Sequence, residues 1–283
     1  MNYKSTIKIN NKNLDLSKPV LMGILNFTPD SFYDGGKFDK ISSAIAHCCK
    51  MAEQGASIID IGAVSTRPFA GEITAETEWQ RLSDLLTELR NALPEIIISV
   101  DTYRASVAEK AANSGADIIN DIAGGQSDQA MFATITRLQI PYIMMHMQGT
   151  PQTMQQNPQY ENVVEEVLSF FRQNIKRLKQ MGHNAPIIID PGFGFGKTVE
   201  HNYQLLKSLD RLKELNCPVL TGVSRKSMIN KVLGTTPDRA LNGTTVINTI
   251  ALLKGADILR VHDVAEAAEV VKLVQIFQNT RKP

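Results

Sequence analysis

The stretches QGASIID (Gln54–Asp60), SGADIIN (Ser114–Asn120) and KGADILR (Lys254–Arg260) repeat one pattern three times in a chain of 283 residues. In each stretch we expect a helix to end at the glycine, in the left-handed backbone conformation, and a short apolar strand to follow. Each strand then ends on a polar residue. The pattern predicts successive helix–strand units, and hence parallel strands.

Short apolar runs and amphipathic helical stretches alternate along the whole chain, which is typical of an α/β protein. We predict eight strands, at Val20–Leu25, Ser57–Ile61, Ile96–Val100, Ile118–Asn120, Tyr142–Met145, Ile187–Ile189, Val219–Val223 and Ile258–Val261. We predict helices after them, roughly at Ile41–Gln54, Ala75–Leu93, Tyr103–Ser114, Gln129–Leu138, Tyr160–Met181, Val199–Leu215, Thr236–Lys254 and Val264–Thr280. Eight strands in a chain of this length favour a single (β/α)8 TIM barrel, and a doubly wound open sheet is the alternative.

The chain shows no low-complexity segment or linker, so we expect residues 1–283 to form one domain with a short polar N-terminal extension over about residues 1–18. A net charge of +1 gives no reason to expect nucleic acid or an anionic membrane as a partner. No apolar stretch approaches the roughly 20 residues of a membrane span, and the polar start is unlike a signal peptide. Cys48, Cys49 and Cys217 lack metal-ligand spacing and are expected to be packing residues, which favours the cytoplasm.

In such a barrel, polar residues at the carboxyl ends of the strands line the catalytic mouth. One group of these residues is cationic or hydrogen-donating and suits a phosphorylated ligand: Arg67, Arg260 and His262. Asn26 supplies an oxygen for Mg²⁺, which keeps most of its waters and shares phosphate oxygens. A second group suits the donor-rich edge of a planar ring: Asp101, Asn120 and Asp190.

Eight motifs, in order, resemble those of the dihydropteroate synthases, a family of pterin-binding TIM barrels. The resemblance runs from about Val20 to Val264. The motifs are MGILNFTPDSFYDGG (Met22–Gly36), DIGAVSTRP (Asp60–Pro68), SVDTYR (Ser99–Arg104), INDIAGG (Ile119–Gly125), MHMQGTPQTMQ (Met145–Gln155), IDPGFGFGK (Ile189–Lys197), GVSRKS (Gly222–Ser227) and LRVHDV (Leu259–Val264).

The resemblance implies that a dihydropterin pyrophosphate condenses with p-aminobenzoate to give dihydropteroate and pyrophosphate in folate biosynthesis, and that the chain is a sulfonamide target. It implies a pterin site of Asp101, Asn120, Asp190 and Lys226, with Arg260 stacked on the ring. It implies a pyrophosphate site of Asn26, Arg67, Arg260 and His262, with Mg²⁺ bridging Asn26 and the phosphates. It implies a p-aminobenzoate pocket of Thr66, Pro68, Phe195, Lys226 and Ser227. It also implies a homodimer formed through the last helices.

The implied chemistry is loss of pyrophosphate to leave a pterin cation, which a nearby carboxylate stabilises. The catalytic candidates are Asp34, Arg67, Asp101 and Lys226. We favour Asp101 for ring recognition and Asp34 for the transition state, although the sequence permits the reverse. We also expect a helix to begin near Ser227, where free N–H groups favour the carboxylate of p-aminobenzoate.

Structural interpretations compete with these roles. Asp101 and Asp121 are equally well explained as helix N-caps, and the role of His146 is ambiguous. Three further histidines are expected to be surface or packing groups: His47, His183 and His201. In one place the chain departs from the family pattern, because Ala63 and Val64 replace the usual Gly-Glu. The rival functions are a corrinoid-linked methyltransferase and a non-catalytic pterin-binding protein.

Overall fold

Within the described residues, eight parallel strands form one sheet in the order β8-β7-β6-β5-β4-β3-β10-β9. The computed structural model describes residues 6–28, 37–64, 73–150, 153–154 and 157–280. A parallel bridge between Ile189 and Val219 brings β8 beside β9 and closes the barrel, so the predicted TIM barrel is confirmed. The strands are β3 (Val20–Asn26), β4 (Ile58–Gly62), β5 (Ile97–Asp101), β6 (Ile118–Asp121), β7 (Tyr142–Met145), β8 (Ile187–Asp190), β9 (Leu220–Thr221) and β10 (Ile258–Val261).

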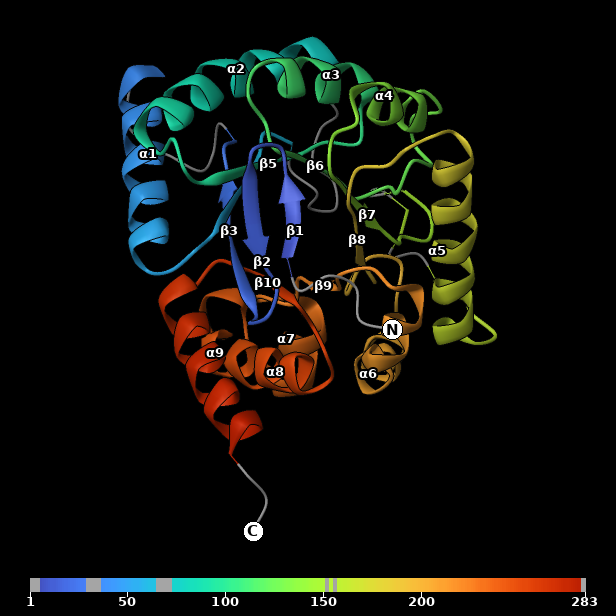
Figure 1. Cartoon of the computed structure of the whole chain (residues 1–283). Coiled ribbons are helices and arrows are strands. Elements are labelled where there is room, and N and C mark those ends of the chain that lie inside the picture. Colours follow the sequence, from blue (N-terminus) through green and yellow to red (C-terminus); the bar gives the residue numbers. More distant parts are fainter. Residues whose placement is uncertain (1–5, 29–36, 65–72, 151–152, 155–156, 281–283) are drawn as a thin grey trace.

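Helices surround the strands as an outer ring (Figure 1). They are α1 (Lys37–Glu53), α2 (Ala75–Ala92), α3 (Ala105–Asn113), α4 (Met131–Leu138), α5 (Val163–Gln180), α6 (Val199–Lys207), α7 (Ser227–Leu233), α8 (Leu241–Leu253) and α9 (Val264–Asn279), with 3-10 helices η2 (Leu209–Leu215) and η3 (Pro237–Arg239). None of the helices described combines the length and the apolar character needed to cross a membrane.

The three repeated glycines are left-handed, as the repeat predicted. Gly55, Gly115 and Gly255 have φ of 106°, 99° and 91°. Glycine adopts this conformation without the steric cost that a side chain would add. Each one ends a helix and directs the chain into the next strand, which explains why one local pattern recurs in three βα units.

The barrel interior contains an apolar layer that follows from the two-residue period of a strand. One buried side chain from each strand points inward, and all eight belong to one hydrophobic cluster: Met22, Ile58, Ile97, Ile118, Ile143, Ile188, Leu220 and Ile258. The next inward-pointing residue on each strand lies two positions further toward the carboxyl end. On several strands this residue is polar, as with Asp60, Asn120 and Arg260. The register of the sheet therefore sets the height of the mouth above the apolar layer.

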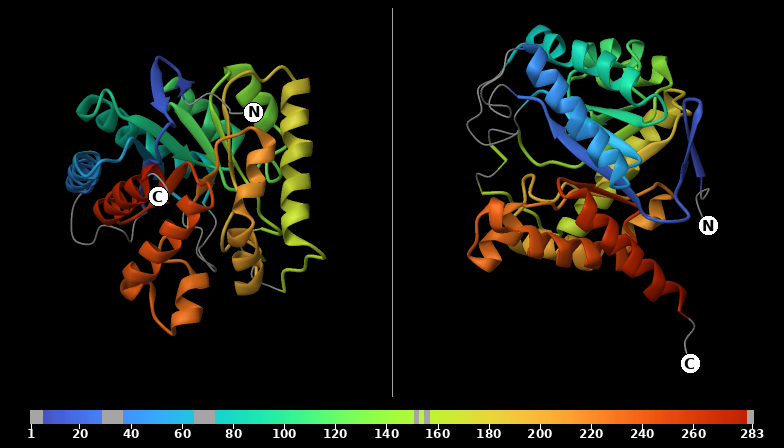
Figure 2. Two further views of the ribbon diagram at one scale, coloured as in Figure 1. Left: turned by 60° about the horizontal axis from the view of Figure 1, so that its bottom comes forward. Right: turned by 90° about the vertical axis from the view of Figure 1, so that its left-hand side faces the viewer.

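The N-terminal extension forms an antiparallel hairpin of β1 (Thr6–Ile9) and β2 (Lys12–Asp15), which the sequence analysis did not predict. The hairpin lies at the opposite end of the barrel from the mouth (Figure 2). Its buried side chains Ile9 and Leu14 complete the apolar layer. Lys12 contacts Asp117, whose carboxylate also accepts a 2.5 Å bond from Arg90. The extension therefore covers the amino-terminal end of the barrel.

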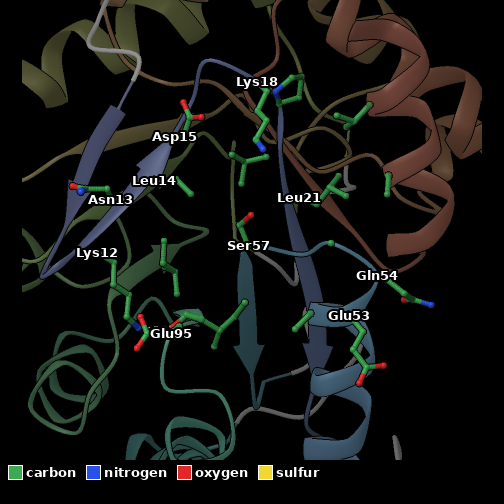
Figure 3. Close-up of a pocket in the computed structure, with 18 of the residues that line it drawn as sticks. Lys12, Asn13, Leu14, Asp15, Lys18, Leu21, Glu53, Gln54, Ser57 and Glu95 are labelled. Atoms are coloured by element: carbon green, nitrogen blue, oxygen red, sulfur yellow. Dashed lines mark hydrogen bonds between the residues drawn. The ribbon is translucent and has the colours of Figure 1, made fainter. Parts of the chain in front are cut away.

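A pocket of about 880 Å³ lies between this hairpin, the end of α1 and α9 (Figure 3). Its labelled lining residues carry charges of both signs, including Lys12, Lys18, Glu53 and Glu95. None of the predicted substrate-binding residues that the structure describes lines it. In TIM barrels this end serves stability, and the chemistry takes place at the carboxyl ends of the strands.

Several predicted boundaries were wrong, each for a local reason. The strand expected at Val219–Val223 is reduced to Leu220–Thr221, because the Val219 N–H donates to Asp257 Oδ2 and the chain turns after Val223. The helix expected from Tyr160 begins at Val163, because Asn162 caps it through Val164 N and Glu165 N. The helix expected at Val199–Leu215 divides into α6 and η2, and the one expected from Thr236 begins as η3 before α8.

Candidate active site

Five polar side chains from five strands meet at the carboxyl end of the barrel: Asp60, Asp101, Asn120, Asp190 and Arg260. Four of them were predicted to bind the pterin. Asp60, Asn120 and Asp190 are buried, and the side chains of Arg260 and Asp101 are 19% and 15% exposed. The cluster therefore forms the floor of the mouth and remains accessible from one side.

Arg260 lies at the centre of this cluster. Its guanidinium donates to Asp60 Oδ2 at 2.7 Å and to Asp101 Oδ2 at 3.0 Å. Asn120 Nδ2 donates to the same Asp60 oxygen at 3.0 Å. A Cβ built on Gly222 would lie 3.9 Å from both Arg260 Cδ and Asp190 Oδ2, so these two side chains flank one point of the mouth. The hydrogen bonds fix the guanidinium between the carboxylates of β4 and β5.

Burial raises the pKa of two carboxyl groups in the mouth, those of Asp101 and Asp190. The pKa of Asp101 is raised to about 7, first by burial and then by the negative charge of Asp60, against the opposing effect of Arg260. Burial also raises the pKa of Asp190, which Lys226 opposes. Asp190 Oδ1 accepts a 2.7 Å bond from Gly192 N, so one of its oxygens is already engaged by the loop that follows β8. Carboxyl groups with perturbed pKa values in a cleft are typical of a functional site.

Lys226 and Phe195, both predicted to bind p-aminobenzoate, lie together in the second part of the mouth. Lys226 Nζ donates to Phe193 O at 2.5 Å and lies 4.5 Å from the centroid of the Phe195 ring, within cation–π range. Burial lowers the pKa of Lys226 to about 8, and Asp190 opposes this shift. The exposed Ser227 begins α7, which confirms the helix start expected there.

His262 and Asn26 lie at the rim. His262 Nδ1 is 3.0 Å from Ser224 Oγ, and His262 N donates to the same hydroxyl at 3.3 Å. Desolvation, followed by the charge of Arg260, lowers the pKa of the His262 ring, so the ring is neutral at pH 7. Asn26 is the exposed last residue of β3. Both residues stand at strand ends on the side of the barrel where the prediction placed the pyrophosphate.

Four predicted site residues lie outside the described residues: Asp34, Thr66, Arg67 and Pro68. The departure from the family pattern is partly described. Ala63 is fully buried, and its carbonyl oxygen accepts a bond from Arg81 Nη1 at 3.1 Å. Val64 is half-buried. The structure gives no reason why these residues should disturb the mouth.

The helix-cap interpretations of Asp101 and Asp121 were wrong. The cap position of α3 is Arg104 and that of α4 is Ala130. Asp121 accepts bonds from Tyr142 OH at 2.6 Å and from two backbone N–H groups of its own turn. It therefore organises the loop after β6, whereas Asp101 faces Arg260.

The other histidines and Asp263 have structural roles. His47 is exposed, His183 is buried, and His201 completes a capping box with Thr198, which confirms the prediction of surface and packing groups. Asp263 forms a two-pronged ion pair with Arg225, with bonds of 2.7 and 2.9 Å. This pair connects the loops after β9 and β10 beneath the rim.

Two residues of the mouth were missed. Asp60 had been noted only as a polar strand end, and its spacing of two residues from the inward Ile58 was the signal that places it inside the barrel. Lys197 had been quoted within the GFGFGK motif without a role. It is 3% exposed, and its ammonium lies 3.0 Å from His146 Nδ1. Only the folded loop reveals that contact, because 51 residues separate the two.

Comparisons with known proteins agree with this geometry. The family described as pterin binding enzymes matches residues 22–262. A dihydropteroate synthase of Haemophilus influenzae is 48% identical over 271 residues, which cover 95% of this chain and 98% of the relative.

Two solved structures extend the likeness to the fold. A Yersinia pestis dihydropteroate synthase in complex with a sulfonamide drug has a TM-score of 0.91 at 38% identity, covering 97% of this chain and 100% of that one. A Xanthomonas albilineans dihydropteroate synthase in complex with 7,8-dihydropteroate has a TM-score of 0.87 at 34% identity, covering 98% and 100%. At these identities and coverages, the two structures support membership of the same family as well as a shared fold. The chain therefore belongs to the pterin-binding enzymes, and among them to the dihydropteroate synthase family.

Proposed function

We propose that this chain is a C–N bond-forming transferase that condenses a 6-hydroxymethyl-7,8-dihydropterin pyrophosphate with p-aminobenzoate, giving 7,8-dihydropteroate and pyrophosphate in folate biosynthesis. The observation that carries the proposal is the cluster of Asp60, Asp101, Asn120 and Arg260 beside Lys226 and Phe195 in one mouth. A fused aminopyrimidinone ring presents adjacent N–H donors, and two carboxylates with an amide match such an edge. The relatives are named for this activity.

The pterin is proposed to lie over Arg260, with its donor edge toward Asp101, Asn120 and Asp190. Asp60 Oδ1 is buried and has no hydrogen-bond partner among the described residues. Buried polar atoms are nearly always satisfied, so this atom is available to a donor from a ligand or water. Asp101 and Asp190 each retain a carboxylate oxygen beyond the bonds described above, which gives the site the acceptors that the ring requires.

The protein's part in the chemistry is positioning and charge stabilisation. As the bond from the exocyclic methylene to the pyrophosphate oxygen breaks, positive charge grows on the pterin. Asp101, whose side chain is partly exposed beside Arg260, offers a carboxylate near this charge. The aromatic amine is neutral at pH 7, so it attacks the methylene carbon without a strong base. Its proton is then lost to solvent. Asp34 stays our proposed stabiliser of the transition state, and Arg67 our proposed partner of the departing pyrophosphate.

Mg²⁺ is the proposed cofactor. No group of three or more His, Cys, Asp or Glu side chains able to hold a metal occurs among the described residues. This fits an ion held by substrate phosphates, water and one protein oxygen, which is how Mg²⁺ commonly binds. Asn26 offers an exposed amide oxygen at the rim. When bound, Mg²⁺ would neutralise negative charge on the pyrophosphate.

We further propose a homodimer formed through the last helices. Adjacent helices α7, α8 and α9 expose large apolar side chains: Val232, Leu233, Val246, Ile250, Leu253, Leu273, Ile276 and Phe277. Leu273, Ile276 and Phe277 are 72%, 71% and 70% exposed. Apolar patches of this kind mark interaction surfaces, and an isologous two-fold contact is the commonest closed assembly.

The remaining proposals concern organisation and compartment. Both proposed substrate sites belong to one barrel, so we propose that residues 1–283 act as one domain. The three cysteines are free thiols, two of them buried, which supports the cytoplasm as the compartment.

The test of function is formation of dihydropteroate, measured by chromatography after the protein is incubated with both substrates and Mg²⁺. Asp190→Asn, which removes a charge from the proposed pterin site, is the matched loss-of-function control. A corrinoid-linked methyltransferase would yield no dihydropteroate. A non-catalytic pterin-binding protein would bind the pterin without forming product, and the intact Arg260–Lys226 cluster argues against it.

A further inference from the structure

The loop after β8, Pro191–Lys197, packs its backbone directly on the loop after β7. A Cβ built on Gly192 would lie 2.0 Å from His146 O, and one built on Gly196 would lie 2.4 Å from Gln148 O. Both glycines have positive φ, 69° and 61°. No side chain fits at these two positions. The two loops therefore contact each other through their main chains, with no side-chain layer between them.

This close contact gathers acceptors around a single buried amine. Lys197 Nζ lies 2.9 Å from Phe195 O, 3.0 Å from Gly192 O and 3.2 Å from His146 O. The fourth neighbour is His146 Nδ1 at 3.0 Å. In its charged form the amine has three N–H groups, and these four polar neighbours come from both loops. Without the amine, His146 O and Phe195 O would lose the donor described for them, whereas Gly192 O would keep its bond from Phe195 N at 3.1 Å. Because unpaired buried polar groups are costly and these two carbonyls belong to different loops, Lys197 holds the two loops together.

No carboxylate within the described residues forms a salt bridge with Lys197. Burial lowers the pKa of Lys197 to about 7, against the opposing charge of Asp190. The amine donates hydrogen bonds whether or not it carries the extra proton. Its contacts with carbonyl oxygens are therefore the basis of its role, and charge pairing is secondary.

The loop that Lys197 holds from within also supplies the aromatic wall of the mouth. Phe195 presents its ring to Lys226 at 4.5 Å, and the adjacent Phe193 O accepts from Lys226 at 2.5 Å. The Phe195 carbonyl accepts from Lys197 at 2.9 Å. Tyr160 OH fixes the next carbonyl, Gly196 O, at 2.8 Å. The orientation of the Phe195 ring thus depends on a backbone held by Lys197.

We propose that Lys197 is a positioning residue for the p-aminobenzoate half of the reaction, acting through the loop that sets Phe195 beside Lys226. This inference rests on the proposed function. The pterin half should depend on it less, because Asp60, Asp101 and Asn120 come from strands on which the loop does not act. Only Asp190, which accepts from Gly192 N, and Lys226, which donates to Phe193 O, connect the described pterin site to the loop. If Lys197 positions the loop, its loss should weaken the binding of p-aminobenzoate much more than that of the pterin substrate. If Lys197 only supports the fold, both substrates should be affected equally.

The test compares Lys197→Met with Lys207→Met, which removes an exposed lysine from the end of α6. We expect Lys197→Met to raise KM for p-aminobenzoate at least tenfold, with less than a threefold change in the affinity for dihydropterin pyrophosphate measured by calorimetry. Lys207→Met should change neither. In a double-mutant cycle, adding Lys197→Met to Phe195→Ala should raise that KM little further, because both changes act on one wall.

A folded Lys197→Met protein with unchanged KM for p-aminobenzoate would overturn the inference, as would equal losses for both substrates. If Lys197→Met does not fold, His146→Phe removes one of the four acceptors and retains the lysine. It should raise the same KM by a smaller factor, and an unchanged value in a folded His146→Phe protein would contradict the proposal. Failure of the proposed function is distinguishable, since the unsubstituted protein would then make no dihydropteroate.

Discussion

Arg260 and Asp60 are 200 residues apart in the chain, yet the Arg260 guanidinium lies 2.7 Å from the Asp60 carboxylate in the floor of the mouth. Asp60 is fully buried, and the same oxygen accepts from Asn120. The pair connects the second and the last strands of the barrel with the fourth. The negative charge of Asp60 also raises the pKa of the neighbouring Asp101.

Pterin binding should weaken as the pH falls through about 7. The pKa of Asp101 is raised to about 7, so the free protein takes up a proton there below that pH. A protonated carboxyl group loses part of its capacity to accept from the ring, and affinity should fall by up to about tenfold per pH unit below the pKa. Calorimetric titration between pH 6 and 8 measures this. Asp101→Asn should bind more weakly and show a flatter profile, and a flat profile in the unsubstituted protein would refute the assignment.

Asp60→Asn should move that midpoint to lower pH. The substitution removes the negative charge that, after burial, contributes most to raising the pKa of Asp101. It also leaves Asp101 as the one described carboxylate bonded to Arg260, and the guanidinium charge then stabilises the ionised form of Asp101. The same pH titration checks the shift. A midpoint that stays in place or rises would show that Asp60 does not act on Asp101 through its charge.

Asp117→Ala should destabilise the fold and leave catalysis intact at 25 °C. Its carboxylate accepts from Arg90 at 2.5 Å, Ile98 N at 2.9 Å and Lys12 at 3.2 Å, far from the mouth. Removing it leaves donors without partners, at a cost of about 3 kcal/mol. Thermal unfolding should show a Tm lower by roughly 5–10 °C.

Asp15→Ala is the matched control for Asp117→Ala, because Asp15 lies in the hairpin that Asp117 contacts through Lys12, and its carboxylate accepts from the nearby Ser17 N in an exposed position. Its Tm should stay within about 2 °C of the unsubstituted protein. Equal Tm values for both variants would mean that the hairpin is not anchored through Asp117.

Phe277→Glu should dissociate the proposed homodimer. The side chain is 70% exposed beside Leu273 and Ile276 on α9, and a charge buried in an apolar contact is costly. Sedimentation velocity should show a dimer for the unsubstituted protein and a monomer for the variant. Met181→Glu, an exposed apolar residue at the end of α5, should leave the dimer intact. A monomeric unsubstituted protein would contradict the proposal.

Asn26→Ala should raise the Mg²⁺ concentration needed for half-maximal activity by about tenfold, since it removes the one protein oxygen proposed to bind the ion. Titration of the initial rate with Mg²⁺ measures the effect. Asn13→Ala, an exposed amide at the opposite end of the barrel, should leave the titration unchanged. Identical titrations for both variants would remove Asn26 from the metal site.

The barrel could be predicted because its signals are local. The glycines at 55, 115 and 255 and the short apolar strands recur with one spacing, and the structure confirms the left-handed turns and the strand order. The ends of elements were less predictable, because competing side-chain bonds determine them. The cap by Asn162 and the bond from Val219 N to Asp257 are such cases.

The candidate site was predictable where a residue ends a strand, as with Asn120 and Arg260. Asp60 was missed because its importance depends on a partner 200 residues away. Lys197 was missed because its acceptors are backbone carbonyls of two loops. Every residue has a backbone carbonyl, so the sequence does not indicate which ones will surround the amine. The folded chain alone brings these groups together.

The measurement that tests the central claim most directly is pyrophosphate release from dihydropterin pyrophosphate with Mg²⁺, with and without p-aminobenzoate. If one mouth binds both substrates, p-aminobenzoate should accelerate release, and dihydropteroate should form in equal amount. No release in either condition, despite measurable pterin binding, would contradict the claim. It would indicate a non-catalytic pterin-binding protein, with Ala63 and Val64 as the first residues to restore to the family pattern.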